Sequence, residues 1–158
     1  MAKDIENFRD HLTKLAEAVE ILDSIDQLSL KIDLIKDIVL YYERTYNSDL
    51  EGWEIVPPNV DNYPHAIWWN YDNISSFTYG NPNPQIVGFL YENREYVKNL
   101  NINNLVDKIT NYIKNKLLTE ASKHNILSCL IFYIHMPMKI QKEIYNNLQE
   151  AIDIELKA

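Results

Sequence analysis

Hydrophobic residues recur every three or four positions along most of the chain, which is the spacing that places side chains on one face of an α-helix. This pattern predicts a first helix over residues 8–22, whose apolar stripe is Phe8, Leu12, Leu15, Val19 and Leu22. It predicts a second helix that begins near Ser29, a residue type favoured at the N-cap, and continues to Tyr46. The turn-forming residues 47–49 are expected to end it.

The same spacing predicts four further helices in the second half of the chain. They cover residues 84–98, 106–117, 120–135 and 140–156. The first of them is expected to open at Pro84, because proline at the first helical position lacks only a donor that would have no partner there anyway. Residues 126–134 are apolar on most sides, so the helix over 120–135 is expected in the interior.

No segment shows the strict alternation of apolar and polar residues that a half-buried strand needs. The fold is therefore predicted to be all-α, a stack of helical hairpins with about six main helices and a short one inside residues 61–69. The length of 158 residues predicts a single domain, since domains run to about 100 to 200 residues. Inside that domain, residues 47–83 form an irregular segment rich in aromatic residues and proline.

Composition and charge narrow the classes of partner. Fifteen Lys and Arg against 23 Asp and Glu give a net charge of −8, which repels phosphate backbones, so nucleic acid is not expected as a partner. The longest apolar run, residues 126–134, is too short to span a bilayer, so no membrane insertion is expected. The N-terminus lacks the apolar core of a signal peptide, and the single cysteine, Cys129, cannot form an internal disulfide. A cytoplasmic location is therefore expected.

The residues that could carry chemistry gather in the irregular segment, which contains all three tryptophans. If Pro64 opens a helical turn, His65, Trp68 and Trp69 share one face at i, i+3 and i+4. Aromatic side chains with a few polar groups line ligand pockets, although they also anchor long loops to a core. The candidate ligand-binding residues are Trp53, Tyr63, His65, Trp68, Trp69, Tyr71, Asp72, Tyr79 and Asn81.

This segment also resembles a known family. The residues that carry the resemblance are Trp53 with Pro57-Pro58, Tyr63-Pro64-His65-Ala66-x-Trp68-Trp69, and Asn81-Pro82-x-Pro84-x-Ile86-x-Gly88-Phe89-Leu90. Over residues 52–91 the chain looks like bacterial proteins related to the prenyltransferase and squalene-oxidase repeat group, which have the α/α-toroid fold of terpenoid cyclases. The resemblance implies a partial, shortened α/α toroid in which the loops before the inner helices face a central cavity.

No complete catalytic set accompanies these residues. The Asp-x-Asp-Asp acid motif of the cyclases is absent from the sequence. No metal site is expected, because Cys129 and His135 are six positions apart on one helix and point in different directions. A glycine-rich phosphate loop and a nucleophilic serine elbow are also absent, and no cofactor is expected. The sequence therefore leans against an enzyme.

Three hypotheses for function follow from these observations. The first is a binding module whose aromatic segment holds a small apolar or ring-containing ligand. The second is an interaction protein that forms a homo-oligomer or binds a protein partner, with the helix over residues 8–22 as the expected contact. The third is an enzyme of the terpenoid cyclase or prenyltransferase type with a reduced site, in which His65 or Asp72 acts as a base. The sequence favours a binding or interaction module over the enzyme.

Overall fold

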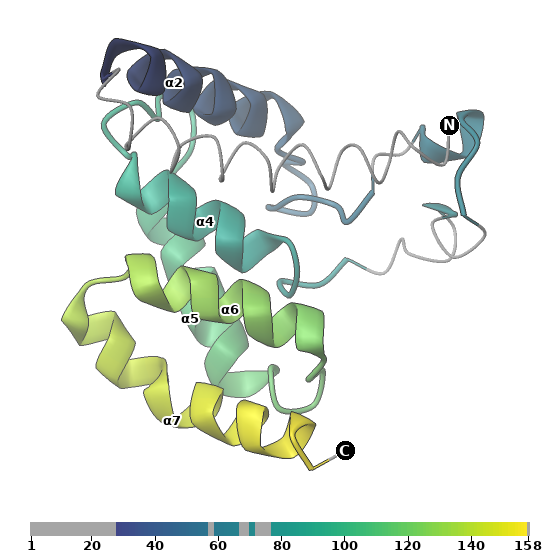
Figure 1. Cartoon of the computed structure of the whole chain (residues 1–158), viewed down its shortest axis with the longest axis vertical. Helices are drawn as coiled ribbons and strands as arrows, with labels where there is room; N and C mark the ends of the chain where they lie inside the picture. Colours follow the sequence, from purple (N-terminus) through teal and green to yellow (C-terminus); the bar gives the residue numbers. More distant parts are fainter. Residues whose placement is uncertain (1–27, 57–58, 67–69, 72–76, 158) are drawn as a thin grey trace. The chain divides into compact units, whose positions relative to one another are not determined.

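The computed structural model describes residues 28–56, 59–66, 70–71 and 77–157. In this part of the chain the fold is all-α, as predicted, with five α-helices, one 3₁₀ turn and no strand (Figure 1). The elements are α2 (Leu28–Thr45), η1 (Val60–Asn62), α4 (Asn83–Glu92), α5 (Ile102–Asn115), α6 (Lys123–His135) and α7 (Met138–Glu155). The helix predicted over residues 8–22 lies outside the described residues, and the toroid arrangement stays a prediction.

The described residues belong to two compact units. The first unit contains the described residues up to 41 and those from 54 to 77. The second unit contains residues 42–53 and 78–157. The division falls inside α2, between Tyr41 and Tyr42. The first unit contributes the buried side chains Ile35, Ile38, Val39, Val56 and Val60.

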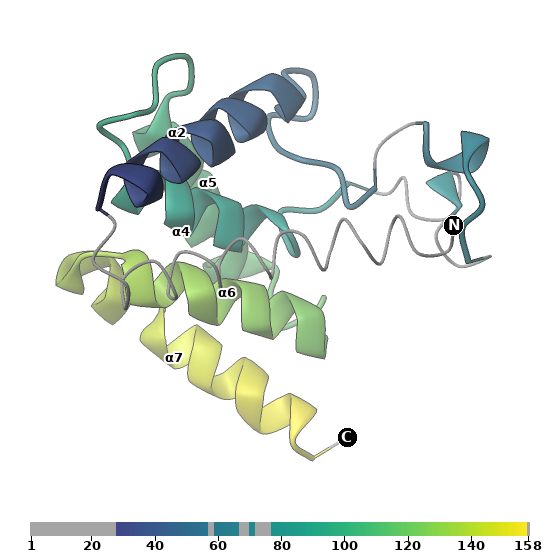
Figure 2. The same cartoon turned by 45° about the horizontal axis from the view of Figure 1, so that its top comes forward.

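The second unit is built around the packing of α4, α5, α6 and α7. Helix α4 packs against α5 and α6, and α7 packs against the same two helices. Figures 1 and 2 both show α6 between α4 and α7. The fully buried side chains of this unit come from all four helices and the turn after α5, and include Leu90, Ile113, Leu117, Phe132 and Ile144. The three-and-four spacing read from the sequence therefore identifies the core faces of these helices.

Gly88 permits the close approach of α4 to α6. A Cβ atom at this position would lie 3.1 Å from the Cα of Phe132, closer than side chains normally come to a neighbouring backbone. The missing side chain thus allows Phe132 to reach the buried position that it occupies, with no exposed surface.

Two predicted features of the helices are wrong. Helix α4 ends at Glu92 and not near Lys98, because the backbone hydrogen bonds after it span three residues, as in a turn, and not four: Tyr96 donates to Asn93 (3.0 Å) and Val97 donates to Arg94 (3.2 Å). The side chain of Asn93 also donates to the carbonyl oxygen of Phe89 (2.9 Å) at this end of the helix. Helix α6 is not enclosed on all sides. Its residues Leu127 and Ile134 are 59% and 67% exposed, since the neighbouring helices cover only the side that carries Cys129 and Phe132.

The short helix predicted inside residues 61–69 is also different. A 3₁₀ turn covers Val60–Asn62, and residues 64–66 have no regular secondary structure, so Pro64 does not open a helical turn there. Tyr63 is extended, with φ −123° and ψ 149°, which ends the 3₁₀ turn before Pro64. Residues 67–69 lie outside the described residues.

Candidate functional site

Trp53 is a buried anchor of the second unit. Its side chain and backbone are 4% exposed, and the indole Nε1–H donates to the carbonyl oxygen of Tyr42 (2.9 Å). The rings of Tyr42 and Tyr46 meet it edge to face, with centroids at 6.1 and 5.2 Å. A tryptophan with its polar group satisfied and its faces covered stabilises packing, so the structure places Trp53 beneath a surface and not on it.

The backbone of Trp53 is held by the side-chain amide of Asn83, the first residue of α4. The N–H of Trp53 donates to Oδ1 of Asn83 (2.8 Å), and Nδ2 of Asn83 donates to the carbonyl oxygens of Trp53 (2.9 Å) and Thr78 (3.1 Å). Asn83 is 1% exposed. We call these contacts the Asn83 clamp, and they supply the partners that buried backbone groups require.

The segment before Trp53 is a tight turn closed by a pair of backbone hydrogen bonds between Asn47 and Gly52 (2.9 and 3.2 Å). The side chain of Asn47 accepts from the N–H groups of Asp49 and Leu50 (3.0 and 3.2 Å). Glu51, the last residue inside the turn, has a φ of +54°. Among the described residues it alone combines a side chain with the left-handed backbone that glycine normally occupies.

The carboxylate of Glu51 pairs with Lys108 from the middle of α5. Oε2 of Glu51 contacts Nζ of Lys108, whose ammonium group also lies 5.9 Å from the ring centroid of Tyr79. The side chain of Lys108 is only 19% exposed, whereas that of Glu51 is 53% exposed. Tyr46 and Tyr79 are half-buried, and Tyr46 covers one edge of Trp53. We call Tyr46, Glu51, Tyr79 and Lys108 the Lys108 cluster.

The charges of the Lys108 cluster act on one another. Burial lowers the pKa of Lys108, but its hydrogen bond to Glu51 and the charges of Tyr79 and Glu51 outweigh burial, so the pKa of Lys108 is raised. Burial also raises the pKa of Tyr46, against the opposing effect of the Lys108 charge. Both raised pKa values favour the protonated forms, so the Lys108 side chain stays an ammonium group and the Tyr46 side chain stays a neutral phenol.

A second polar group lies in the first unit and contains His65. Its Nδ1 donates to the carbonyl oxygen of Tyr63 (2.6 Å), and its Nε2 lies 3.1 Å from Oδ1 of Asp61. The same Asp61 oxygen accepts from the backbone N–H of Tyr71 (3.2 Å). The hydroxyl of Tyr71 in turn donates to Glu54. Both imidazole nitrogens thus face acceptors that lie nearby in the sequence, and the longer-range contacts of this group are those of Tyr71 with Asp61 and Glu54.

The predicted ligand-binding residues therefore divide between the two units. Tyr63, His65 and Tyr71 come together in the first unit, where Tyr63 is exposed. Trp53, Tyr79 and Asn81 belong to the second unit. Asn81 is half-buried and its backbone N–H donates to Oδ1 of Asn125 (3.0 Å). The remaining predicted residues, Trp68, Trp69 and Asp72, lie outside the described residues.

Sequence reasoning missed the charged partners of both groups. Asp61 was detectable, because it precedes His65 by four positions, whereas the sequence hypothesis considered Asp72 as its carboxylate. Glu51 was missed because the next residue, Gly52, is of the type that normally adopts the left-handed conformation in a turn. Lys108 had no local signal, since only the packing of α5 brings it to Glu51.

Other chemistry finds little support in the described part of the chain. No group of three or more His, Cys, Asp or Glu side chains there could hold a metal ion. Cys129 has no exposed surface, and burial raises the pKa of its thiol to about 12, so it is a poor nucleophile. Of the helices described, none has the length and apolar character needed to cross a membrane.

No protein-family model, curated protein or solved structure matches this chain. The resemblance to the prenyltransferase and squalene-oxidase repeat group stays a prediction.

Proposed function

We propose that the protein is a binding module and that the Lys108 cluster is its ligand site. The ligand that best suits these side chains is a polar molecule with a ring, such as a saccharide. The sequence hypothesis of a binding or interaction module is thereby kept, but its site is moved from the face of His65 and Trp68 to Tyr46, Glu51, Tyr79 and Lys108.

The observation that carries this proposal is the backbone of Glu51. A side chain in the left-handed region costs about 1 to 3 kcal/mol, and such residues cluster at ligand-binding and active sites. The pairing with Lys108 is too weak to explain the choice of residue, because partly exposed ion pairs contribute about 0.2 to 1 kcal/mol. Glycine would suit the turn better, so the Glu51 carboxylate is supported as a functional group.

The lining of the cluster indicates the class of ligand. Lys108 occupies Oε2 of Glu51, and a carboxylate offers two acceptor oxygens to hydroxyl groups. Tyr46 and Tyr79 add ring faces and phenolic hydroxyls beside them. An isoprenoid chain suits this site poorly, because it would strip water from the ion pair without replacing its hydrogen bonds.

The terpenoid-type enzyme is the weaker alternative. It was predicted to use His65 or Asp72 as a base, and both nitrogens of His65 already face Tyr63 and Asp61. A general base needs a nitrogen within reach of the substrate proton. The geometry of His65 is thus better suited to tying its segment together than to proton transfer.

Calorimetric titration with cellobiose, maltose, chitobiose and the isoprenoid alcohol farnesol tests the proposal. We expect at least one disaccharide to bind, and Tyr79→Leu to weaken that binding at least about tenfold, which is 1.4 kcal/mol. Tyr91→Leu is the matched control, because Tyr91 is a half-buried tyrosine of α4 that stacks with Arg94 (4.8 Å) outside the cluster. Binding of farnesol alone, or no binding at all, would contradict the proposal.

A further inference from the structure

Exposed hydrophobic side chains of the second unit are concentrated on one pair of helices. Among its described residues, every large hydrophobic side chain that is exposed belongs to α6, α7 or the residue after α7. They are Leu127, Ile134, Met138, Tyr145, Ile154 and Leu156. All but Ile154 are more than half exposed. A concentration of this kind on an otherwise acidic protein indicates an interaction surface.

On α7 these residues form a regular stripe. The stripe begins at Met138 and continues with Tyr145, Ile152 and Leu156. These residues lie about two, four and five helical turns of 3.6 residues after Met138, so the four side chains share one face. Ile152 is half-buried and the other three are exposed. We call them the α7 stripe. Ile154 lies on another face of the helix.

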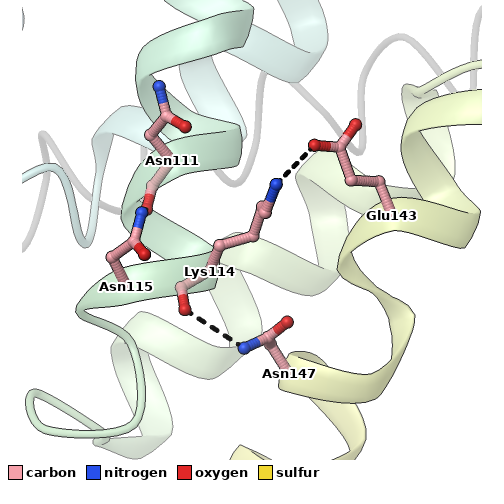
Figure 3. Close-up of polar contacts among 5 residues, drawn as sticks. All are labelled: Asn111, Lys114, Asn115, Glu143 and Asn147. Carbon is pink, nitrogen blue, oxygen red and sulfur yellow. Dashed lines mark hydrogen bonds and ion pairs between the residues drawn. The ribbon is translucent and has the colours of Figure 1, made fainter.

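Two other faces of α7 contact the rest of its own unit. Ile144, Leu148 and Ala151 are buried in the core. Figure 3 shows the polar contacts with α5, in which Nζ of Lys114 meets Glu143 (2.7 Å) and Asn147 donates to the carbonyl oxygen of Lys114 (3.2 Å). On the side of α6, Gln141 donates to the carbonyl oxygen of Tyr133 (3.0 Å). These contacts fix the rotation of α7, and the stripe is left outside them.

The charges beside the stripe identify its partner. Lys142 in the first half of α7 and Asp153 in the second half lie on the same side of the stripe, about 40° and 60° around the helix from Met138. Two copies of α7 packed in parallel would place like charges together. In an antiparallel pair, Lys142 comes opposite Asp153 of the partner subunit, and Met138 comes opposite Leu156 of the partner subunit. The helix is therefore complementary to itself in one orientation, as a two-fold symmetric contact requires.

We infer that the protein forms a homodimer through antiparallel contact of the two α7 stripes. This goes beyond the proposed ligand site and is independent of it, since no residue of the Lys108 cluster belongs to α7. It also assigns self-association to a different helix from the one over residues 8–22 that the sequence indicated.

Sedimentation velocity of the full chain over a range of concentrations tests the inference. We expect the mass to rise from 18.6 kDa toward twice that value as the concentration increases. Tyr145→Asp should keep the chain monomeric, because it places a charge at the centre of the stripe. Ile154→Asp, the same kind of change on another face of α7, should leave the dimer intact. Thermal melting confirms that both variants are folded.

A charge exchange tests the antiparallel orientation. Lys142→Glu should weaken the dimer at least about tenfold, and adding Asp153→Lys in the same chain should restore it, because each ion pair across the two-fold axis is then reversed. A chain that stays monomeric at every concentration would overturn the inference. So would a Tyr145→Asp variant that dimerises like the parent, or a double exchange that does not recover.

Discussion

Two polar clusters of the second unit flank Trp53, and they differ in burial and in backbone strain. The Asn83 clamp is almost fully buried, and its amide satisfies the backbone groups of Trp53 and Thr78 without a strained residue. The Lys108 cluster is partly exposed and is built on Glu51, whose backbone is in the left-handed region. The contacts of the clamp stabilise the fold, whereas the Lys108 cluster contains a residue whose backbone conformation costs stability.

Of the variants that test this comparison, Asn83→Asp should lower the free energy of unfolding the most. Aspartate has the same shape but lacks the amide donors, so a buried carboxylate would face the carbonyl oxygens of Trp53 and Thr78. An uncompensated buried charge costs about 3 to 5 kcal/mol, and we expect the free energy of unfolding to fall by about 3 kcal/mol or more. Urea unfolding measures it.

Asn81→Asp is the matched control for that change. It makes the same substitution two positions earlier, at a half-buried side chain outside the clamp. We expect a loss of less than about 1 kcal/mol there. Equal losses in the two variants would mean that the clamp does not stabilise the fold in the way described.

Gly80→Ala should lower the free energy of unfolding by less than Asn83→Asp and by more than Asn81→Asp. A Cβ atom at residue 80 would lie 2.6 Å from Oδ1 of Asn125 and 2.9 Å from the hydroxyl of Tyr112. Asn125 cannot move away freely, because its side chain accepts from the backbone N–H of Asn81 (3.0 Å) and donates to the carbonyl oxygen of Glu120 (2.8 Å). Such overpacking typically costs about 1 to 3 kcal/mol.

The double variant Gly80→Ala with Asn125→Ala checks the cause of that loss. Removing the Asn125 amide removes the closest clash and leaves only the contact with the Tyr112 hydroxyl (2.9 Å), so Gly80→Ala should cost clearly less stability in the Asn125→Ala background than in the parent chain. Urea unfolding measures the loss of stability in each single variant and in the double variant. If the two single losses add up to the loss in the double variant, the explanation is contradicted, because additive losses indicate independent sites.

The helices could be predicted because each one is determined mainly by residues that are close together in the sequence. The spacing of apolar residues located α2, α5, α6 and α7, and it identified core residues such as Ile113 and Ile144. The end of α4 was not predictable from apolar spacing, since residues 93–97 form turns although Val97 continues the apolar spacing.

The candidate site was much less predictable. Tyr79 was among the predicted ligand-binding residues, but Lys108 and Glu51 meet only through the packing of α5 against the turn at 47–52. Trp53 was predicted at the site for its aromatic ring, and burial against Tyr42 and Tyr46 makes it a support beneath the cluster. Sequence spacing reports on neighbours along one helix and cannot report on such contacts.

Glu51→Gly tests directly whether the Glu51 side chain serves ligand binding or the stability of the fold. Glycine removes the backbone strain and loses the ion pair with Lys108, so the free energy of unfolding should be unchanged or higher by up to about 1 kcal/mol. Asp49→Gly is the matched control, because it removes the same charge from the same turn without relieving strain.

The decisive measurement is the stability of Glu51→Gly together with its affinity for the disaccharide that the parent chain binds. We predict a stability at least equal to that of the parent and an affinity at least about tenfold weaker, a loss of 1.4 kcal/mol in binding. A variant that unfolds more easily by more than about 1 kcal/mol and binds the disaccharide as well as the parent would show that Glu51 serves the fold, and would contradict the account.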